Sequence, residues 1–272
     1  MTERTYRILN KILRLSVEDP YIIPEGFDKF LCAETERADI VIADDGRDDE
    51  RYCYGIGYLS DRGKKISNVF FSRKDSRQML YSHGEDYARM HLHLEPQCTQ
   101  EILAELMMVG FYSYVSLRET LLLHASAIYH KGKVVVFTAA SGVGKTTQSE
   151  LWQKHRNAAI INGDKVFLAK ECGKTIAWGS PWKGSSDYAE NIGAETAAII
   201  VLEQGEENTI RKLSGMEILE KLLPHVFFPN WDARCEHGVL ELLNELLEQT
   251  EVYFLRCRPD EDAVAMVEKT VF

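Results

Sequence analysis

Short apolar runs separated by polar, turn-forming residues dominate the first third of the chain. Runs of this length, rich in β-branched and aromatic residues, are typical of β-strands. The clearest of them lie at residues 30–32, 39–43, 52–58, 69–71 and 89–94. The periodicity of residues 6–15 does not decide between a helix and a strand. Residues 1–98 are therefore predicted to form a β-rich N-terminal domain.

Residues 99–122 follow a helical period instead. Their apolar side chains recur every three or four positions and form one broad face. This face consists of Ile102, Leu103, Leu106, Met107, Phe111 and Tyr114. Charged residues within the segment, among them Glu105 and Arg118, argue for a buried helix of a globular protein and against a membrane span. We assign residues 99–120 to a helix that connects two domains.

Strand-like and helix-like segments alternate from residue 121 onward. Strands are predicted at residues 123–128, 134–138, 158–161, 196–202 and 252–256, and helices at 145–155 and 232–250. Two further helices are predicted from their start signals. Ser214 and Glu217 have the spacing of a capping box, and Pro259 with Asp260 opens the last helix. The alternation predicts an α/β domain over residues 121–272.

A Gly-rich segment joins the strand at 134–138 to the helix at 145–155. It reads Ala-Ala-Ser-Gly-Val-Gly-Lys-Thr-Thr and has Ala139 where the pattern GxxxxGK[ST] has its first glycine. Such a loop points backbone N–H groups at a polyphosphate, and the helix N-terminus adds partial positive charge. Lys145 would neutralise phosphate oxygens and Thr146 would bind Mg²⁺. The alternative is an ordinary turn with an exposed lysine. The predicted phosphate-binding residues are Ser141, Gly142, Val143, Gly144, Lys145, Thr146 and Thr147.

Two side chains outside the loop are predicted to join it. Asp164 follows the strand at 158–161, and the carboxyl ends of parallel strands meet at one edge of a sheet. Its carboxylate would hold Mg²⁺ or accept a proton from an incoming hydroxyl. The alternative is a surface turn. His124 interrupts an apolar strand, and beside a carboxylate it would tune that group's proton affinity; a core histidine is the alternative.

The segment 178–191 is rich in Gly, Pro, Trp and Ser and is predicted to be a loop. Loops of this kind, carried by a rigid sheet, often form the walls of ligand sites. Its aromatic residues could stack on a ligand, and Lys183 could meet an anion. A packed aromatic turn explains the same composition equally well.

Composition narrows the classes of partner and compartment. The 272 residues are 45% hydrophobic, which is normal for a globular core, and the net charge of −10 disfavours nucleic acid because phosphates would be repelled. The six scattered cysteines form no C-x-x-C pair and are interpreted as reduced thiols. No secretory signal or long apolar span is recognisable. We expect a cytoplasmic protein that is not bound to a membrane.

Taken together, His124, the Gly-rich loop and Asp164 resemble the catalytic domain of HPr kinase/phosphorylase and its kinase-like relatives, which share a structural class with phosphoenolpyruvate carboxykinase. The resemblance covers residues 121–202, and residues 252–271 more loosely. It implies an α/β P-loop kinase domain preceded by the β-rich domain. It also implies that the loop binds ATP, that Lys145 and Thr146 serve phosphate and Mg²⁺, and that Asp164 acts as a base supported by His124.

The chain departs from that family at two points. Lys165 follows Asp164 where the family has paired aspartates, and the signature Glu-Ile-Arg-Gly-Leu-Gly is missing. The chain is more similar to shorter HPr-kinase-like proteins of peptide-maturation systems, which include the lasso-peptide kinases. The segments Leu-His-Ala-Ser-Ala, Ile-Asn-Gly-Asp-Lys and Gly-Ser-Pro-Trp carry this likeness. It implies phosphorylation of a serine on a small peptide.

The sequence therefore predicts an ATP- and Mg²⁺-dependent kinase that phosphorylates a hydroxyl, with a peptide or protein serine as the favoured acceptor. A kinase of small-molecule alcohols is one alternative. A nucleotide-binding scaffold or sensor without transfer activity is another. The sequence leaves open the acceptor, the reverse phosphorolysis, the donor nucleotide, the second metal ligand and the role of the N-terminal domain. It also leaves open whether the chain forms a homo-oligomer.

Overall fold

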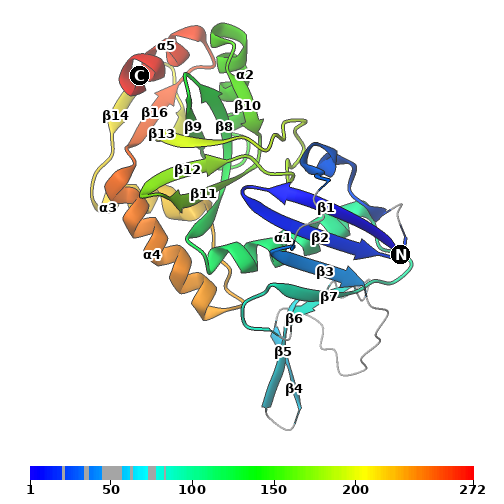
Figure 1. The fold of residues 1–272 in the computed structure, drawn as a ribbon. Helices are drawn as coiled ribbons and strands as arrows, with labels where there is room; N and C mark the ends of the chain where they lie inside the picture. Colours follow the sequence, from blue (N-terminus) through cyan, green and yellow to red (C-terminus); the bar gives the residue numbers. More distant parts are fainter. Residues whose placement is uncertain (20–21, 34–36, 45–56, 62–63, 73–77, 83) are drawn as a thin grey trace. The chain divides into compact units, whose positions relative to one another are not determined.

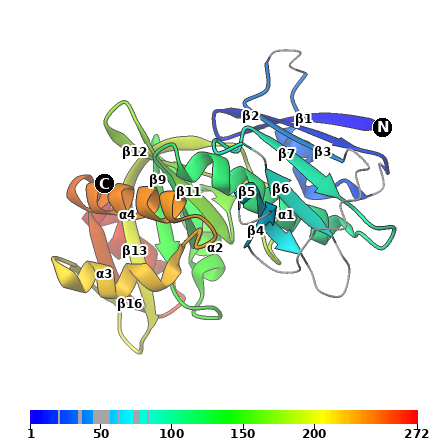
Figure 2. The same cartoon turned by 90° about the horizontal axis from the view of Figure 1, so that it is seen from below.

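The computed structural model describes residues 1–19, 22–33, 37–44, 57–61, 64–72, 78–82 and 84–272 (Figures 1 and 2). These residues divide into two compact units. Unit 1 comprises Met1–Arg118 and Pro229–Glu236, and unit 2 comprises Glu119–Phe228 and His237–Phe272. Together they give a mixed α/β protein with two sheets.

The described strands of unit 1 form one seven-stranded sheet in the order β1-β2-β3-β7-β6-β5-β4. Strand β3 is parallel to both of its neighbours, β2 and β7, and the outer pairs are antiparallel. The strands are β1 (Thr2–Ile8), β2 (Lys11–Val17), β3 (Ile40–Asp44), β4 (Gly57–Asp61), β5 (Lys64–Ser72), β6 (Met79–Ser82) and β7 (Arg89–His93). The strands predicted at 39–43, 69–71 and 89–94 are among them.

Residues 6–15 form most of the β1–β2 hairpin, which turns at Leu9 with a positive φ of 57°. The strand predicted at residues 30–32 is wrong. A 3-10 helix, η2 (Glu25–Phe30), ends there, and an isolated bridge joins Leu31 to Tyr6. Most of the run at 52–58 lies outside the described residues.

Helix α1 (Gln100–Ser116) packs within unit 1. It begins at Thr99, whose hydroxyl accepts a hydrogen bond from the Ile102 N–H at 3.4 Å. Gly110 lets the helix approach the sheet, because an added Cβ would lie 3.0 Å from side-chain atoms of both Leu80 and Met90. The helix ends at Ser116, earlier than predicted, because the chain enters the first strand of unit 2 at Thr120.

The described strands of unit 2 form a nine-stranded sheet in which β8 and β13 each pair with several partners. The pairings β8–β11, β11–β12, β12–β13, β13–β9 and β9–β8 close a circuit. The strands are β8 (Thr120–His130), β9 (Lys133–Thr138), β10 (Ala159–Asn162), β11 (Lys165–Glu171), β12 (Lys174–Trp178), β13 (Gly193–Gln204), β14 (Thr209–Lys212), β15 (Val226–Phe227) and β16 (Val252–Cys257). All five strands predicted for this half are present.

The placement of Asp164 from the sequence assumed that β10 is a parallel neighbour of β9. The structure shows that the two strands are not neighbours. Strand β8 lies between them and runs antiparallel to both. The ends of β9 and β10 therefore point the same way, on either side of the middle of β8. His124, in β8, lies at this point.

The helices after α1 largely follow the predicted segments. They are α2 (Lys145–Arg156), α3 (Met216–Leu222) with the 3-10 turn η3 (Leu223–His225), α4 (Ala233–Gln249) and α5 (Glu261–Val271). Asp260 caps α5 at the predicted start of the last helix, since its carboxylate accepts a hydrogen bond from the Ala263 N–H at 3.0 Å. The start signal read from the sequence is therefore confirmed for this helix.

The capping box predicted at Ser214 and Glu217 is wrong. Gly215 is the N-cap of α3, and no side chain accepts a hydrogen bond there. The Glu217 carboxylate is held instead by Arg211, with N–O distances of 2.9 and 2.5 Å. The Glu217 side chain, which the sequence pattern assigned to capping α3, therefore forms an ion pair with Arg211 of β14 instead.

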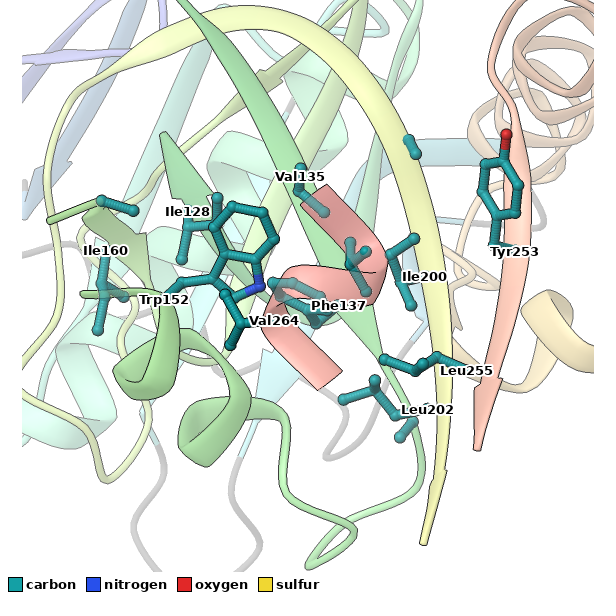
Figure 3. Packing of buried hydrophobic residues seen from close by; sticks show 14 residues of the cluster. Ile128, Val135, Phe137, Trp152, Ile160, Ile200, Leu202, Tyr253, Leu255 and Val264 are labelled. Carbon is teal, nitrogen blue, oxygen red and sulfur yellow. The ribbon is translucent and has the colours of Figure 1, made fainter. Parts of the chain in front are cut away.

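The core of unit 2 lies between the sheet and helices α2 and α5 (Figure 3). Trp152 of α2 is fully buried within it. Its ring lies 5.4 Å from that of His130 and 6.4 Å from that of Phe137, measured between centroids. Val264 of α5 belongs to the same cluster. This packing fixes α2, and with it the loop that precedes α2, against the sheet.

Trp152→Ala is expected to lower the free energy of unfolding by about 3–5 kcal/mol, because it removes a large buried ring and leaves a cavity. Denaturant unfolding measures the loss. Leu240→Ala is the control, since Leu240 is 42% exposed on α4 and its replacement should change stability by less than about 0.5 kcal/mol. Equal effects of the two substitutions would contradict the packing described for Trp152.

The described residues bear on two expectations from the sequence, the lack of a membrane span and the reduced state of the cysteines. No helix among them combines the length and apolar character needed to cross a membrane. The five described cysteines, Cys32, Cys98, Cys172, Cys235 and Cys257, are free thiols. Cys53 lies outside the described residues.

Candidate functional site

The Gly-rich loop lies between the end of β9 and the start of α2, as predicted. Gly142 and Gly144 have positive φ values of 80° and 116°, a region that side chains with a Cβ rarely adopt. Ala139 is not among the residues with positive φ and is buried in the core cluster. The loop therefore needs glycine at 142 and 144, and tolerates alanine at 139.

Lys145 folds back over this loop. Its Nζ lies 3.0 Å from His124 Nε2 and donates to the carbonyl of Ala139 at 3.0 Å. The side chain is buried, and burial lowers its pKa while the charge of Asp164 opposes the change. The ammonium group is thus held at the concave side of the loop, where an anionic ligand would compensate its burial.

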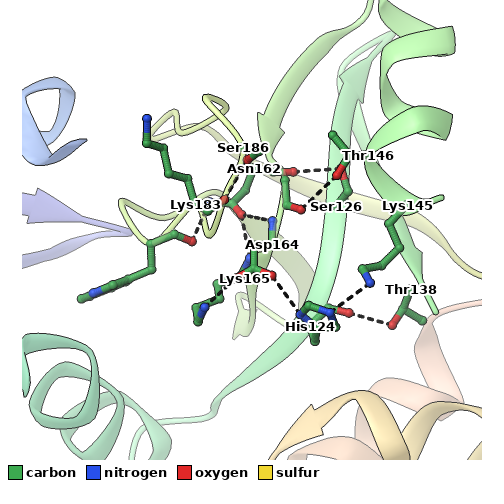
Figure 4. Close-up of polar contacts among 12 residues, drawn as sticks. His124, Ser126, Thr138, Lys145, Thr146, Asn162, Asp164, Lys165, Lys183 and Ser186 are labelled. Carbon is green, nitrogen blue, oxygen red and sulfur yellow. Dashed lines mark hydrogen bonds and ion pairs between the residues drawn. The ribbon is translucent and has the colours of Figure 1, made fainter. Parts of the chain in front are cut away.

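His124 links Lys145 to Asp164 (Figure 4). Its Nδ1 lies 3.0 Å from Asp164 Oδ1, and its Nε2 faces Lys145. A neutral imidazole with its proton on Nδ1 satisfies both contacts, because it donates to the carboxylate and accepts from the ammonium. The structure therefore brings together the three side chains that the sequence singled out from β8, α2 and the segment after β10.

Asp164 is engaged on both carboxylate oxygens. Lys165 Nζ contacts Oδ2 at 2.5 Å, while His124 contacts Oδ1. Burial alone would raise the pKa of Asp164, but the hydrogen bonds from His124 and Lys165 outweigh it and lower the pKa to about 2. The carboxylate is therefore ionised throughout the ordinary pH range.

Asn162 fixes the position of Asp164, and the sequence argument did not identify it as a site residue. The Asn162 Oδ1 accepts from the backbone N–H groups of both Asp164 and Lys165 at 2.7 Å, which makes a tight turn between β10 and β11. Its Nδ2 donates to the Ser180 carbonyl at 2.8 Å, and the residue is fully buried. The dipeptide Asn-Gly before Asp164 was the available signal, because it is typical of turns.

Gly184, in the loop between β12 and β13, lies directly against Asp164. It has a φ of 60°, and an added Cβ would lie 2.7 Å from Asp164 Cγ. The residue after Asp164, Lys165, is paired with His124 across β11 and β8. The carboxylate is thus confined from the loop side as well as from the strands.

Gly184→Ala is expected to displace Asp164 and to lower the rate of the phosphoryl transfer that the sequence predicts by about 10²-fold, the effect of misplacing a reacting group by roughly 1 Å. Gly173→Ala is a matched control. Gly173 has a similar φ of 74° but no atom within 4 Å of an added Cβ. Both variants should lose stability from backbone strain, and only Gly184→Ala should lose activity. Rate measurements and denaturant unfolding separate the two effects.

A cavity of about 280 Å³ joins these groups. Its lining includes the loop residues Gly142, Gly144 and Thr147 together with Lys145 and Asp164. Thr146 also lines it, and its hydroxyl lies 3.5 Å from the Gly163 carbonyl. Backbone amides, an ammonium group and hydroxyls at one concave surface make an anion-binding arrangement.

The residues present fit a Mg²⁺ ion that shares its coordination with phosphate. Thr146 and Asp164 offer a hydroxyl and a carboxylate oxygen in the same cavity, which are ligands that Mg²⁺ accepts. Among the described residues, no group of three His, Cys, Asp or Glu side chains could hold a metal ion. The remaining ligands would therefore come from phosphate oxygens and water.

The Trp-containing loop favours the packing interpretation. Trp182 is 6% exposed and its ring lies 6.1 Å from that of Phe167. Trp178 ends β12 and donates from Nε1 to Glu171 at 2.8 Å. Lys183 lines the cavity and pairs with the exposed Asp187 at 3.1 Å. The two tryptophans thus support the loop, and Lys183 lies at the cavity.

The similarity of this chain to known proteins is weak. No protein-family model and no curated protein matches the chain. Among solved structures, the HPr(Ser) kinase/phosphatase from Coxiella burnetii matches with a TM-score of 0.34 and 13% identity, over 55% of this chain and 87% of that chain. A likeness at this level carries no argument about activity and assigns no family. The functional conclusion therefore rests on the site itself.

Proposed function

We propose that the protein is an ATP- and Mg²⁺-dependent kinase that transfers the γ-phosphoryl group to a hydroxyl, with a serine of a peptide or protein as the favoured acceptor. The contact series Lys145–His124–Asp164 beside the Gly-rich loop carries this proposal. In it an ammonium group suited to phosphate and a carboxylate contact the two ring nitrogens of one imidazole. The serine acceptor rests on the sequence likeness to peptide kinases.

Donor binding would use the loop and the start of α2. The backbone N–H groups of the loop and the helix N-terminus would bind phosphate oxygens. Lys145 would turn from the Ala139 carbonyl toward the β and γ oxygens, which supply a stronger, charged partner. Mg²⁺, when bound, would offset phosphate charge, and Thr146 and Asp164 would hold it directly or through water.

Transfer would form a bond between the acceptor hydroxyl oxygen and the γ-phosphorus. The bond from that phosphorus to the β–γ bridging oxygen would break, and ADP would leave with its electron pair. The hydroxyl proton would pass to a carboxylate oxygen of Asp164. His124 and Lys165 would orient that carboxylate, since each holds one of its oxygens.

A nucleotide-binding scaffold without transfer activity is the second candidate. The observation in its favour is the low pKa of Asp164, about 2, which makes the carboxylate a weak base. Positioning and charge neutralisation supply most of the rate in phosphoryl transfer, so a weak base is compatible with a kinase. A direct assay therefore has to decide between the two.

Incubation with γ-labelled ATP, Mg²⁺ and serine-containing peptides tests the proposal. A kinase gives labelled peptide, and the same peptide with Ser→Ala gives none. A kinase of small alcohols would label only small-molecule acceptors. ATP binding without label in any acceptor would support the scaffold and overturn the proposed transfer.

A further inference from the structure

A second cavity, of about 400 Å³, adjoins the phosphate-binding cavity. Gly142, Gly144 and Thr147 line both cavities, so the two meet along the loop and the start of α2. The second one extends toward the ends of β13 and β16, where Leu202 and Cys257 line it. Its volume falls within the range of small-molecule sites, about 300–1,000 Å³.

A triphosphate bound in the first cavity would have its α-phosphate end directed toward this second cavity. Asp164, Lys145 and Thr146 line the first cavity but not the second. A γ-phosphate placed near Asp164 therefore puts the α-phosphate toward Gly144 and Thr147, at the boundary. Whatever is attached to the α-phosphate must continue beyond that boundary.

Gln148 supplies an independent observation. It lines the second cavity and is 3% exposed, yet its Nε2 has no hydrogen-bond partner among the described residues. A buried donor without a partner is costly, and an acceptor on a ligand would remove that cost. Gln204, on the same wall, already donates to the Val143 carbonyl at 3.2 Å. The unpaired amide thus distinguishes Gln148 from its neighbour on the wall.

The other walls suit an apolar, flat group. Val143, Leu202, Cys257 and Pro259 are the apolar residues of its lining, which also includes the carboxylate-bearing Glu203. A different cavity borders the loop near Phe254, but Lys221 and Arg211 already lie over that ring, at 4.8 and 5.2 Å from its centroid. A base stacked on Phe254 would have to compete with these cations, so the second cavity is the better place for a base.

We propose that the second cavity binds the nucleoside of the phosphate donor. The base lies against the wall of Val143, Leu202 and Pro259, and Gln148 Nε2 donates to an acceptor atom of the base or ribose. This inference rests on the proposed function, because it takes the donor to be a nucleoside triphosphate. It adds the site that distinguishes a nucleotide from a bare polyphosphate.

Comparing ATP with inorganic tripolyphosphate, each with Mg²⁺, tests the inference by calorimetry. The wild type is expected to bind ATP more tightly. Cys257→Phe, which narrows the cavity, should weaken ATP binding by about tenfold or more and leave tripolyphosphate binding unchanged. Gln148→Leu should weaken ATP binding by about five- to tenfold through the lost hydrogen bond. Cys257→Ser, which keeps the volume, is the control, and thermal melts confirm that each variant folds.

Alkylation gives a readout without substitution. ATP should protect Cys257 from alkylation, tripolyphosphate should not, and the exposed Cys172 should react equally in both cases. Equal binding of ATP and tripolyphosphate, or equal weakening of both by Cys257→Phe, would overturn the nucleoside site while phosphate binding stands. Failure of the wild type to bind either ligand would overturn the proposed function, and the inference with it.

Discussion

Lys145→Met is expected to reduce phosphoryl transfer by about 10³-fold and to weaken ATP binding, because it removes the positive charge that would neutralise the β and γ oxygens. Methionine keeps most of the side-chain volume in a position that is only 7% exposed. Lys145→Ala should abolish transfer too, but it also leaves space beside the Ala139 carbonyl. Initial rates and calorimetry with ATP measure the two effects.

Lys154→Met is the matched control for this substitution. Lys154 lies on the same helix, α2, and is exposed. Its replacement should leave both the rate and the ATP affinity unchanged within about twofold. If Lys145→Met retained wild-type ATP affinity and rate, the loop would not be the phosphate site.

Asp164→Asn is expected to lower the transfer rate by about 10²–10⁴-fold while ATP affinity changes by only a few-fold. The amide cannot take the hydroxyl proton, but it keeps the shape of the side chain. Lys165 loses its charged partner in this variant, so the double variant Asp164→Asn/Lys165→Met checks that the loss does not come from the unpaired ammonium. A variant with near wild-type turnover would exclude Asp164 as the base.

The same substitution has a pH signature in stability. The folded-state pKa of Asp164 is about 2, below the unfolded value of 3.8, so its ionised form stabilises the protein above pH 3.8. That contribution, on the order of 2 kcal/mol, is lost as the pH falls toward the folded-state pKa. Asp164→Asn should remove this part of the acid dependence of unfolding. Asp187→Asn, at a solvent-facing carboxylate, should not.

The local signals in the sequence predicted much of unit 2. Continuous apolar runs indicated the strands β9, β13 and β16, and Asp260 caps α5 as its position before the helix indicated. The glycines of the loop have the positive φ values that the motif requires. These features depend on a few neighbouring residues, so the sequence carries them directly.

Non-local pairing explains the errors. Strands β11 and β12 escaped prediction because their apolar runs, at residues 166–169 and 176–178, are short, and their pairing with β8 and β13 makes them strands. Glu217 pairs with Arg211 on another element rather than capping its own helix. Asp164 meets His124 because the antiparallel pairing of β11 with β8 places the adjacent Lys165 opposite His124, and not because two parallel strands end at one edge.

By itself the sequence determined the Gly-rich motif between a strand and a helix, the alternation of elements, and the choice of Lys145, His124 and Asp164 as candidate site residues. Only the tertiary structure decided that His124 contacts both of the others, that Lys165 and Asn162 hold the carboxylate, and that a second cavity opens beside Gln148. The reason is physical. Backbone conformation follows from local steric preferences, whereas the distance between side chains far apart in the chain follows from strand pairing and core packing.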